Sequence, residues 1–129
     1  MLPNAREGYF FRQHSVGIRP SPTSARAYSE VMIRHTVAFR LRHDSGSAGE
    51  RSFLSEAESL AAIPGVERFE QLRQVSSKNG FSYGFSMEFA DQAAYEAYNV
   101  HPVHVAFVRD RWVPEVEDFL ELDYVPLDV

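Results

Sequence analysis

Two stretches in which apolar and polar residues alternate constrain the fold of this chain most. In Ile33–Leu41 every second residue, from Ile33 through His35 to Leu41, belongs to one side, and Phe81–Phe89 repeats the pattern with aromatic residues and Met87. A period of two is typical of a β-strand with one buried face. The chain is therefore expected to contain a sheet whose apolar face needs a covering layer.

Helical segments supply that layer. Glu50–Ala62 carries its apolar residues on one side and ends at Ile63-Pro64-Gly65, which turns the chain. Asp91 can cap a helix that runs to about Asn99, and a second helical piece is expected from Pro102 to Trp112. Two more strands are expected, at 66–75 and 119–125, with Lys78-Asn79-Gly80 as a hairpin turn before 81–89.

The order of elements is strand, helix, strand, strand, helix, strand. This order is the ferredoxin-like βαββαβ pattern of the α+β class, a four-stranded antiparallel sheet with two helices on one face. The other sheet face is too polar for a second dry core, since it would carry Arg34, Thr36, Ala38, Ser82, Gly84 and Ser86. We expect a homodimer in which two such faces meet, forming a dimeric α+β barrel.

Composition limits the partners and the compartment. The 129 residues suffice for one domain, expected at 32–129, after a flexible N-terminal tail or extension at 1–31. Four arginines and two glutamates give the tail a charge of +2, whereas nine basic and sixteen acidic residues give 32–129 a charge of −7. An acidic domain is a poor match for nucleic acid. The chain has no cysteine and no apolar run long enough for a membrane span, so a cytoplasmic location is expected.

The tail admits other interpretations. Arg19-Pro20-Ser21-Pro22 has linker chemistry, and the many arginines with few acids faintly resemble an organelle transit peptide. Alternatively, Met32 is the true start of the protein.

The segment Tyr98–His104 contains two of the five histidines, His101 and His104, with Pro102 between them. Proline is favoured at the first helical position, which puts His101 at the cap and His104 in the first turn. There the helix dipole favours a neutral imidazole, the form that acts as a base. The alternative is structural, with His104 as a hydrogen-bonded residue that holds the start of the helix.

Five pieces of the sequence, in order, resemble the stress-responsive dimeric α/β-barrel family, often called Dabb. They are Ile33–Phe39, Ile63–Val66, Phe85–Asp91, Tyr98–His104 and Leu122-Asp123-Tyr124, which together span about residues 32–126. The resemblance implies a homodimer. The family includes a plant polyketide cyclase that forms olivetolic acid by an intramolecular aldol condensation, without metal or organic cofactor.

The resemblance implies roles for four residues. His104 would be the general base, Tyr98 its catalytic partner, Asp123 the aspartate near the base, and His35 a pocket histidine. We expect Asp123 to orient His104, as in base–orienter pairs of hydrolases. We expect a pocket between helices and sheet for a small apolar or aromatic ligand, with four phenylalanines as substrate-binding residues: Phe39, Phe85, Phe89 and Phe107.

Other functions stay open at this point. The chain could be a binding module for a metabolite with no turnover, or a structural dimer in which the histidine motif only holds the helix. Fold analogy alone adds a monooxygenase with or without haem. A metal site of His101, His104 and His35 is disfavoured, because no cysteine or HExxH helix supports it. We expect no metal and no cofactor.

Overall fold

The structure is a computed structural model that describes residues 30–128. The expected tail at 1–31 lies almost wholly outside these residues. The described elements, in chain order, are β1 (Ile33–Leu41), α3 (Ala48–Ala57), the 3₁₀ helix η1 (Glu58–Ala62), β2 (Glu67–Arg73), β3 (Tyr83–Phe89), α4 (Gln92–Val100), α5 (Pro102–Phe107), the π-helix η2 (Val108–Trp112), α6 (Val113–Glu115) and β4 (Val116–Tyr124).

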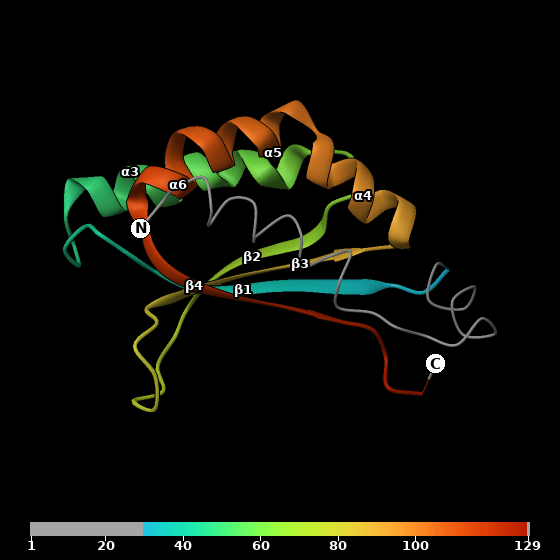
Figure 1. Cartoon of the computed structure of the whole chain (residues 1–129), viewed down its shortest axis with the longest axis horizontal. Coiled ribbons are helices and arrows are strands. Elements are labelled where there is room, and N and C mark those ends of the chain that lie inside the picture. The colour runs from blue at the N-terminus through green and yellow to red at the C-terminus, as the bar shows by residue number, and fades with distance from the viewer. Residues whose placement is uncertain (1–29, 129) are drawn as a thin grey trace.

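The sheet has the predicted four antiparallel strands, in the order β2-β3-β1-β4. The helices lie together on one face of it (Figure 1). This architecture confirms the ferredoxin-like α+β fold. Strand β1 is central, and its register pairs His35 with Met87 on β3 and with Asp123 on β4.

Two of the three predicted helical segments differ from the structure. The first, expected at Glu50–Ala62, begins at Ala48, where Ser47 Oγ accepts a hydrogen bond from Glu50 N, and its last five residues form η1. Glu50 Oε1 in turn accepts a hydrogen bond from Gly46 N, so the two side chains satisfy one amide in the first turn and one before the cap. The second helix starts at Pro102 as predicted, but its α-helical part ends at Phe107 and a π-helix follows.

The strand ends differ as well. Strand β4 starts at Val116 rather than 119, and β2 and β3 stop short of the expected hairpin turn, which lies within a longer loop at 74–82.

Between sheet and helices lies a core dominated by aromatic rings. Phe39 on β1 is fully buried in this core. Its ring contacts those of four residues from β3, α3 and η2, which are Phe53, Tyr83, Phe85 and Trp112. The predicted apolar face of β1 therefore packs as expected.

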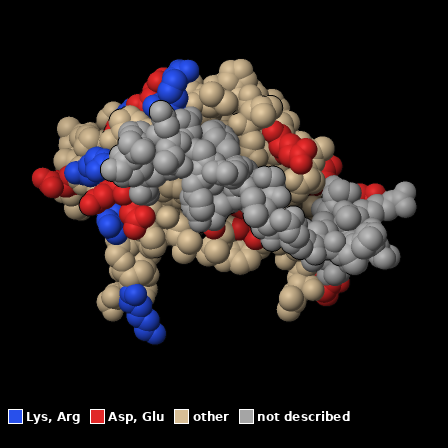
Figure 2. Space-filling view, viewed as in Figure 1, with Lys and Arg blue, Asp and Glu red and all other residues tan. Residues whose placement is uncertain are grey.

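Charged side chains are unevenly spread over the face shown in Figure 2. Basic and acidic side chains lie together on the left, whereas the right part carries acidic side chains without basic ones beside them. Within residues 30–128, no helix is long and apolar enough to cross a lipid bilayer.

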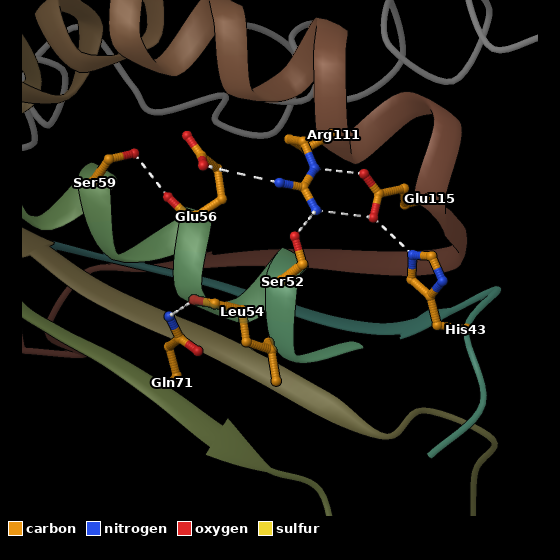
Figure 3. Close-up of polar contacts among 8 residues, drawn as sticks. All are labelled: His43, Ser52, Leu54, Glu56, Ser59, Gln71, Arg111 and Glu115. Carbon is orange, nitrogen blue, oxygen red and sulfur yellow. Dashed lines mark hydrogen bonds and ion pairs between the residues drawn. The ribbon is translucent and has the colours of Figure 1, made fainter. Parts of the chain in front are cut away.

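A polar network fastens α3 to the segment that leads into β4 (Figure 3). The Arg111 guanidinium donates to both carboxylate oxygens of Glu115 and to Ser52 Oγ, and it lies 3.9 Å from Glu56 Oε1. His43 Nε2 lies 2.7 Å from Glu115 Oε1. Burial alone would raise the pKa of the Glu115 carboxyl, but the bonds from Arg111 and His43 outweigh it and hold that pKa below its ordinary value.

Glu115→Gln should lower the free energy of unfolding by about 1.5–3 kcal/mol at pH 7, the range for hydrogen bonds to charged groups. A carboxyl whose folded pKa is lowered stabilises the protein above its ordinary pKa, and this contribution is lost as the pH falls below about 4. Urea unfolding at pH 7 and pH 3 measures both effects, with the exposed Glu117→Gln as the matched control. A deficit that is equal at the two pH values would contradict the assignment.

Candidate active site

A small, partly enclosed cavity lies between the sheet and the helical layer. Its volume is about 10 Å³, room for roughly one water molecule. Three of the residues that line it were selected from the sequence as polar site residues, namely His35, Tyr98 and His104. The other lining residues are apolar or aromatic: Val37, Leu60, Phe85, Met87, Phe107, Val108 and Trp112. The structure therefore brings together three of the four predicted polar residues, around a chamber much smaller than a ligand pocket.

His104 lies on α5 and is 1% exposed. Its Nδ1 is 3.1 Å from the carbonyl oxygen of Asn99, in the turn before the helix. Because a carbonyl only accepts, Nδ1 carries the hydrogen, and in the neutral ring the lone pair resides on Nε2. This is the tautomer of an Nε2 base.

Tyr98 is buried on α4, and its ring packs on that of His104 with centroids 4.3 Å apart. Burial raises the pKa of its phenol, and the nearby carboxyls Glu121 and Asp123 raise it further. The hydroxyl therefore keeps its proton, so it can donate a hydrogen bond to a substrate oxygen.

Asp123 pairs with His35 rather than with His104. The two residues are opposite each other in the β1–β4 ladder, on the face toward the helices, and Asp123 Oδ1 lies 2.6 Å from His35 Nδ1. The expectation was that Asp123 orients His104, whereas β4 places its carboxylate beside β1, on His35. The His104 ring is held by a hydrogen bond to the Asn99 carbonyl.

Two further residues, Tyr95 and Glu121, complete a buried cluster around His35. The Tyr95 hydroxyl lies 2.7 Å from Asp123 Oδ2, 3.1 Å from Glu121 Oε2 and 2.9 Å from His35 Nδ1. Sequence reasoning did not select Tyr95 or Glu121 as site residues. The signal for both was positional: Tyr95 lies one helical turn before Tyr98, and Glu121 lies two residues before Asp123.

The proton count explains the cluster's charge. Tyr95 has one hydroxyl hydrogen and cannot donate it to both carboxyls, so a proton on Glu121 lets both contacts be hydrogen bonds. Burial raises the pKa of Glu121 to about 9, and the charge of Asp123 contributes. Burial and the same two carboxyls also raise the pKa of Tyr95. At neutral pH, Glu121 and Tyr95 are therefore both uncharged.

The remaining predicted residues divide into two groups. Phe85 and Phe107 line the cavity, whereas Phe39 and Phe89 lie in the aromatic core and are not among its lining residues. His101 caps α5, as expected, and accepts a hydrogen bond from Val103 N. The described residues best placed to hold a cation are His35, Glu121 and Asp123, whose ligand atoms lie within 4.8 Å of one another, but hydrogen bonds already join them.

Comparison with known proteins gives a consistent result. The family model described as "Stress responsive A/B Barrel Domain", Dabb, matches residues 33–126. A Dabb family protein with a ferredoxin-like fold from Mesorhizobium loti is 67% identical, with a TM-score of 0.74 over 75% of this chain and 98% of that one. A dimeric ferredoxin-like protein of unknown function from Bacteroides fragilis is 21% identical, with a TM-score of 0.58 over 74% of this chain and 96% of that one.

Two plant proteins also match, both at less than 25% identity. Hydroxynitrile lyase from Passiflora edulis has a TM-score of 0.67 at 16% identity, over 78% of this chain and 97% of that one. A stress-response A/B barrel domain-containing protein of Arabidopsis thaliana is 24% identical over 96 residues, which are 73% of this chain. The chain spans only 36% of the length of that relative.

Proposed function

We propose that this chain, which belongs to the stress-responsive A/B barrel (Dabb) family, is an acid–base enzyme that makes or breaks a carbon–carbon bond next to a carbonyl group. The supporting observation is that His104 and His35, with Tyr98 between them, meet at one otherwise apolar cavity. Buried titratable groups are costly, and they concentrate at functional sites. An aldol-type polyketide cyclase and a cyanohydrin lyase both perform this chemistry, and the fold is shared with a hydroxynitrile lyase.

The chemistry follows from the tautomer of His104. In the cleavage direction, Nε2 takes the proton of a hydroxyl group, the oxygen forms a carbonyl, and the bond to the neighbouring carbon breaks with its electron pair on the leaving carbon. Tyr98 donates a hydrogen bond to the reacting oxygen. In the synthetic direction, the same groups act in reverse order as an aldol cyclase. General base catalysis of this kind contributes about 100- to 10,000-fold.

The cavity has to widen before a substrate fits, since 10 Å³ is below the size of any carbonyl compound. Part of its wall is suited to moving. Val108 and Trp112 belong to the π-helix η2, a form that is rare and frequent at functional sites. Met87 on the sheet side has a flexible, adaptable side chain.

The test uses two probes that release benzaldehyde, mandelonitrile and 4-hydroxy-4-phenylbutan-2-one. We expect the wild-type chain to cleave at least one, and His104→Gln to lower kcat/KM about 100- to 10,000-fold. His101→Asn is the matched control, because it removes the neighbouring histidine but keeps an oxygen to cap α5. Equal turnover by wild type and His104→Gln would overturn the proposal.

A second candidate function is a structural dimer without turnover, and the small volume of the cavity favours it. In that case neither probe binds or reacts, while His104→Gln still lowers the melting temperature. Binding of both probes without cleavage by the wild type would instead indicate a metabolite-binding module. These outcomes separate the three functions.

We also propose that two copies associate through the sheet face that the helices leave open. Along β2 and β4 that face exposes large apolar side chains, namely Leu72, Leu120, Leu122 and Tyr124, each 45–52% exposed. A patch of this kind on a sheet is typical of an interface. A neighbour with the same fold is described as dimeric. Sedimentation equilibrium of the full chain gives the oligomeric state.

A further inference from the structure

The cavity is lined by two histidines that differ in their hydrogen-bond partners. His104 Nδ1 is 3.1 Å from a backbone carbonyl, whereas His35 Nδ1 is 2.6 Å from a carboxylate. A carboxylate stabilises the charged imidazolium far more than a carbonyl does. Of the two histidines, His35 is therefore the one that a carboxylate holds, the arrangement typical of an imidazole that donates a proton.

We propose that His35 is the proton donor of the site, with Asp123 as its positioning residue. The inference rests on the proposed function and extends it. In the cleavage direction, His104 takes the hydroxyl proton and the leaving carbon carries an electron pair. The imidazolium of His35 gives its proton to that carbon, which forms a C–H bond and leaves His35 neutral.

The pair extends from the cavity toward the surface. The His35 side chain lines the cavity and is 2% exposed, whereas the Asp123 side chain is 22% exposed. Because Nδ1 keeps its hydrogen on the carboxylate, Nε2 is the ring nitrogen that gives a proton to the leaving carbon. Solvent that replaces the products returns a proton to Nε2. The proton that His104 took returns to solvent, so the cycle consumes none.

The groups around His35 keep one negative charge next to it. Glu121 and Tyr95 face its Nδ1 from β4 and α4, Tyr98 packs near its ring with centroids 6.2 Å apart, and His104 shares the cavity. Three of these neighbours, Glu121 and both tyrosines, hold their protons at neutral pH, for the reasons given above. Asp123 is then the carboxylate that balances the imidazolium.

The two benzaldehyde-releasing probes also test this role. Cyanide is a weakly basic leaving group and needs little help from an acid, whereas the enolate released from 4-hydroxy-4-phenylbutan-2-one is strongly basic. We expect Asp123→Asn and His35→Gln to lower kcat on the hydroxyketone about 100- to 10,000-fold, and on mandelonitrile by at least ten times less. His104→Gln should affect both probes alike. Glu117→Gln, the same change at an exposed position of β4, is the control.

A purely structural role would lower turnover of both probes in the same proportion. If Asp123→Asn lowers kcat equally on both probes, or on neither, the donor role is overturned. A loss of turnover in His104→Gln in the same experiment would still support His104 as the base. No turnover of either probe by the wild type would overturn the proposed function and the donor role together. If Asp123→Asn fails to fold, Tyr95→Phe is the substitute, because it removes one hydrogen bond to Asp123. We then expect a smaller loss of kcat on the hydroxyketone and none on mandelonitrile. An unchanged kcat on the hydroxyketone would overturn the proposal.

Discussion

Replacing Phe39 by alanine should lower the free energy of unfolding by about 3–5 kcal/mol, the range for removing a large aromatic side chain from a core. Phe39 is 0% exposed and lies on β1, one of the two inner strands of the sheet. Its ring centroid is 4.7 Å from that of Phe85 and 5.0 Å from that of Trp112. The truncation leaves a void that sheet, α3 and η2 all border, so no single element can close it.

Urea unfolding of Phe39→Ala, Phe39→Leu and Val75→Ala measures this effect. Phe39→Leu keeps most of the volume and should cost clearly less than the alanine variant. Val75 is 87% exposed in the loop between β2 and β3, so its truncation reports what a surface position contributes. A loss below about 1 kcal/mol in Phe39→Ala would mean that the ring is not packed as described. Measuring KM for a benzaldehyde-releasing probe separates a core role from a pocket role. If Phe39 belongs to the core, Phe39→Leu lowers the free energy of unfolding and leaves KM unchanged.

The fold was predictable from sequence because its signals are local. The alternation in Ile33–Leu41 gave that strand's bounds without error, and the cap at Asp91 gave the start of α4. The errors also have local causes. The 3₁₀ segment Glu58–Ala62 and the π-helix Val108–Trp112 keep a helical residue pattern. They differ from an α-helix only in how many residues apart the backbone hydrogen-bond partners lie, which is three and five respectively.

The site was predictable only in part, because its contacts depend on strand register. Sequence reasoning and the family resemblance selected His104, Tyr98 and His35, which do share a cavity. The partner of Asp123 could not be predicted, since His35 lies 88 residues away and the pairing follows from how β4 aligns with β1. Tyr95 and Glu121 were missed for the same reason. Neither belongs to a recognisable motif, and only the folded chain places the Tyr95 hydroxyl next to the Glu121 carboxyl.

Replacing Glu121 by glutamine should stabilise the protein, by about 2–4 kcal/mol at pH 7. Burial raises the pKa of Glu121 to about 9, while in the unfolded chain this carboxyl has its ordinary, much lower pKa. Between these two values the folded protein holds a proton that the unfolded chain has lost. The folded state therefore loses about 1.4 kcal/mol of stability per unit of pH. Glutamine keeps the shape and the hydrogen bond to Tyr95 but has no proton to lose.

The sign and the pH range distinguish this prediction from a simple loss of contacts. The stability that the neutral carboxyl contributes is complete below about pH 4 and is lost as the pH rises toward 9. Denaturant unfolding from pH 5 to pH 9 should therefore show Glu121→Gln close to wild type at pH 5 and increasingly more stable above it. Glu117→Gln on the same strand should stay within about 0.5 kcal/mol of wild type throughout. A Glu121→Gln variant that is less stable at every pH would show that Glu121 is ionised and paired with a protonated His35, because only a charged carboxylate loses an attraction when it becomes an amide.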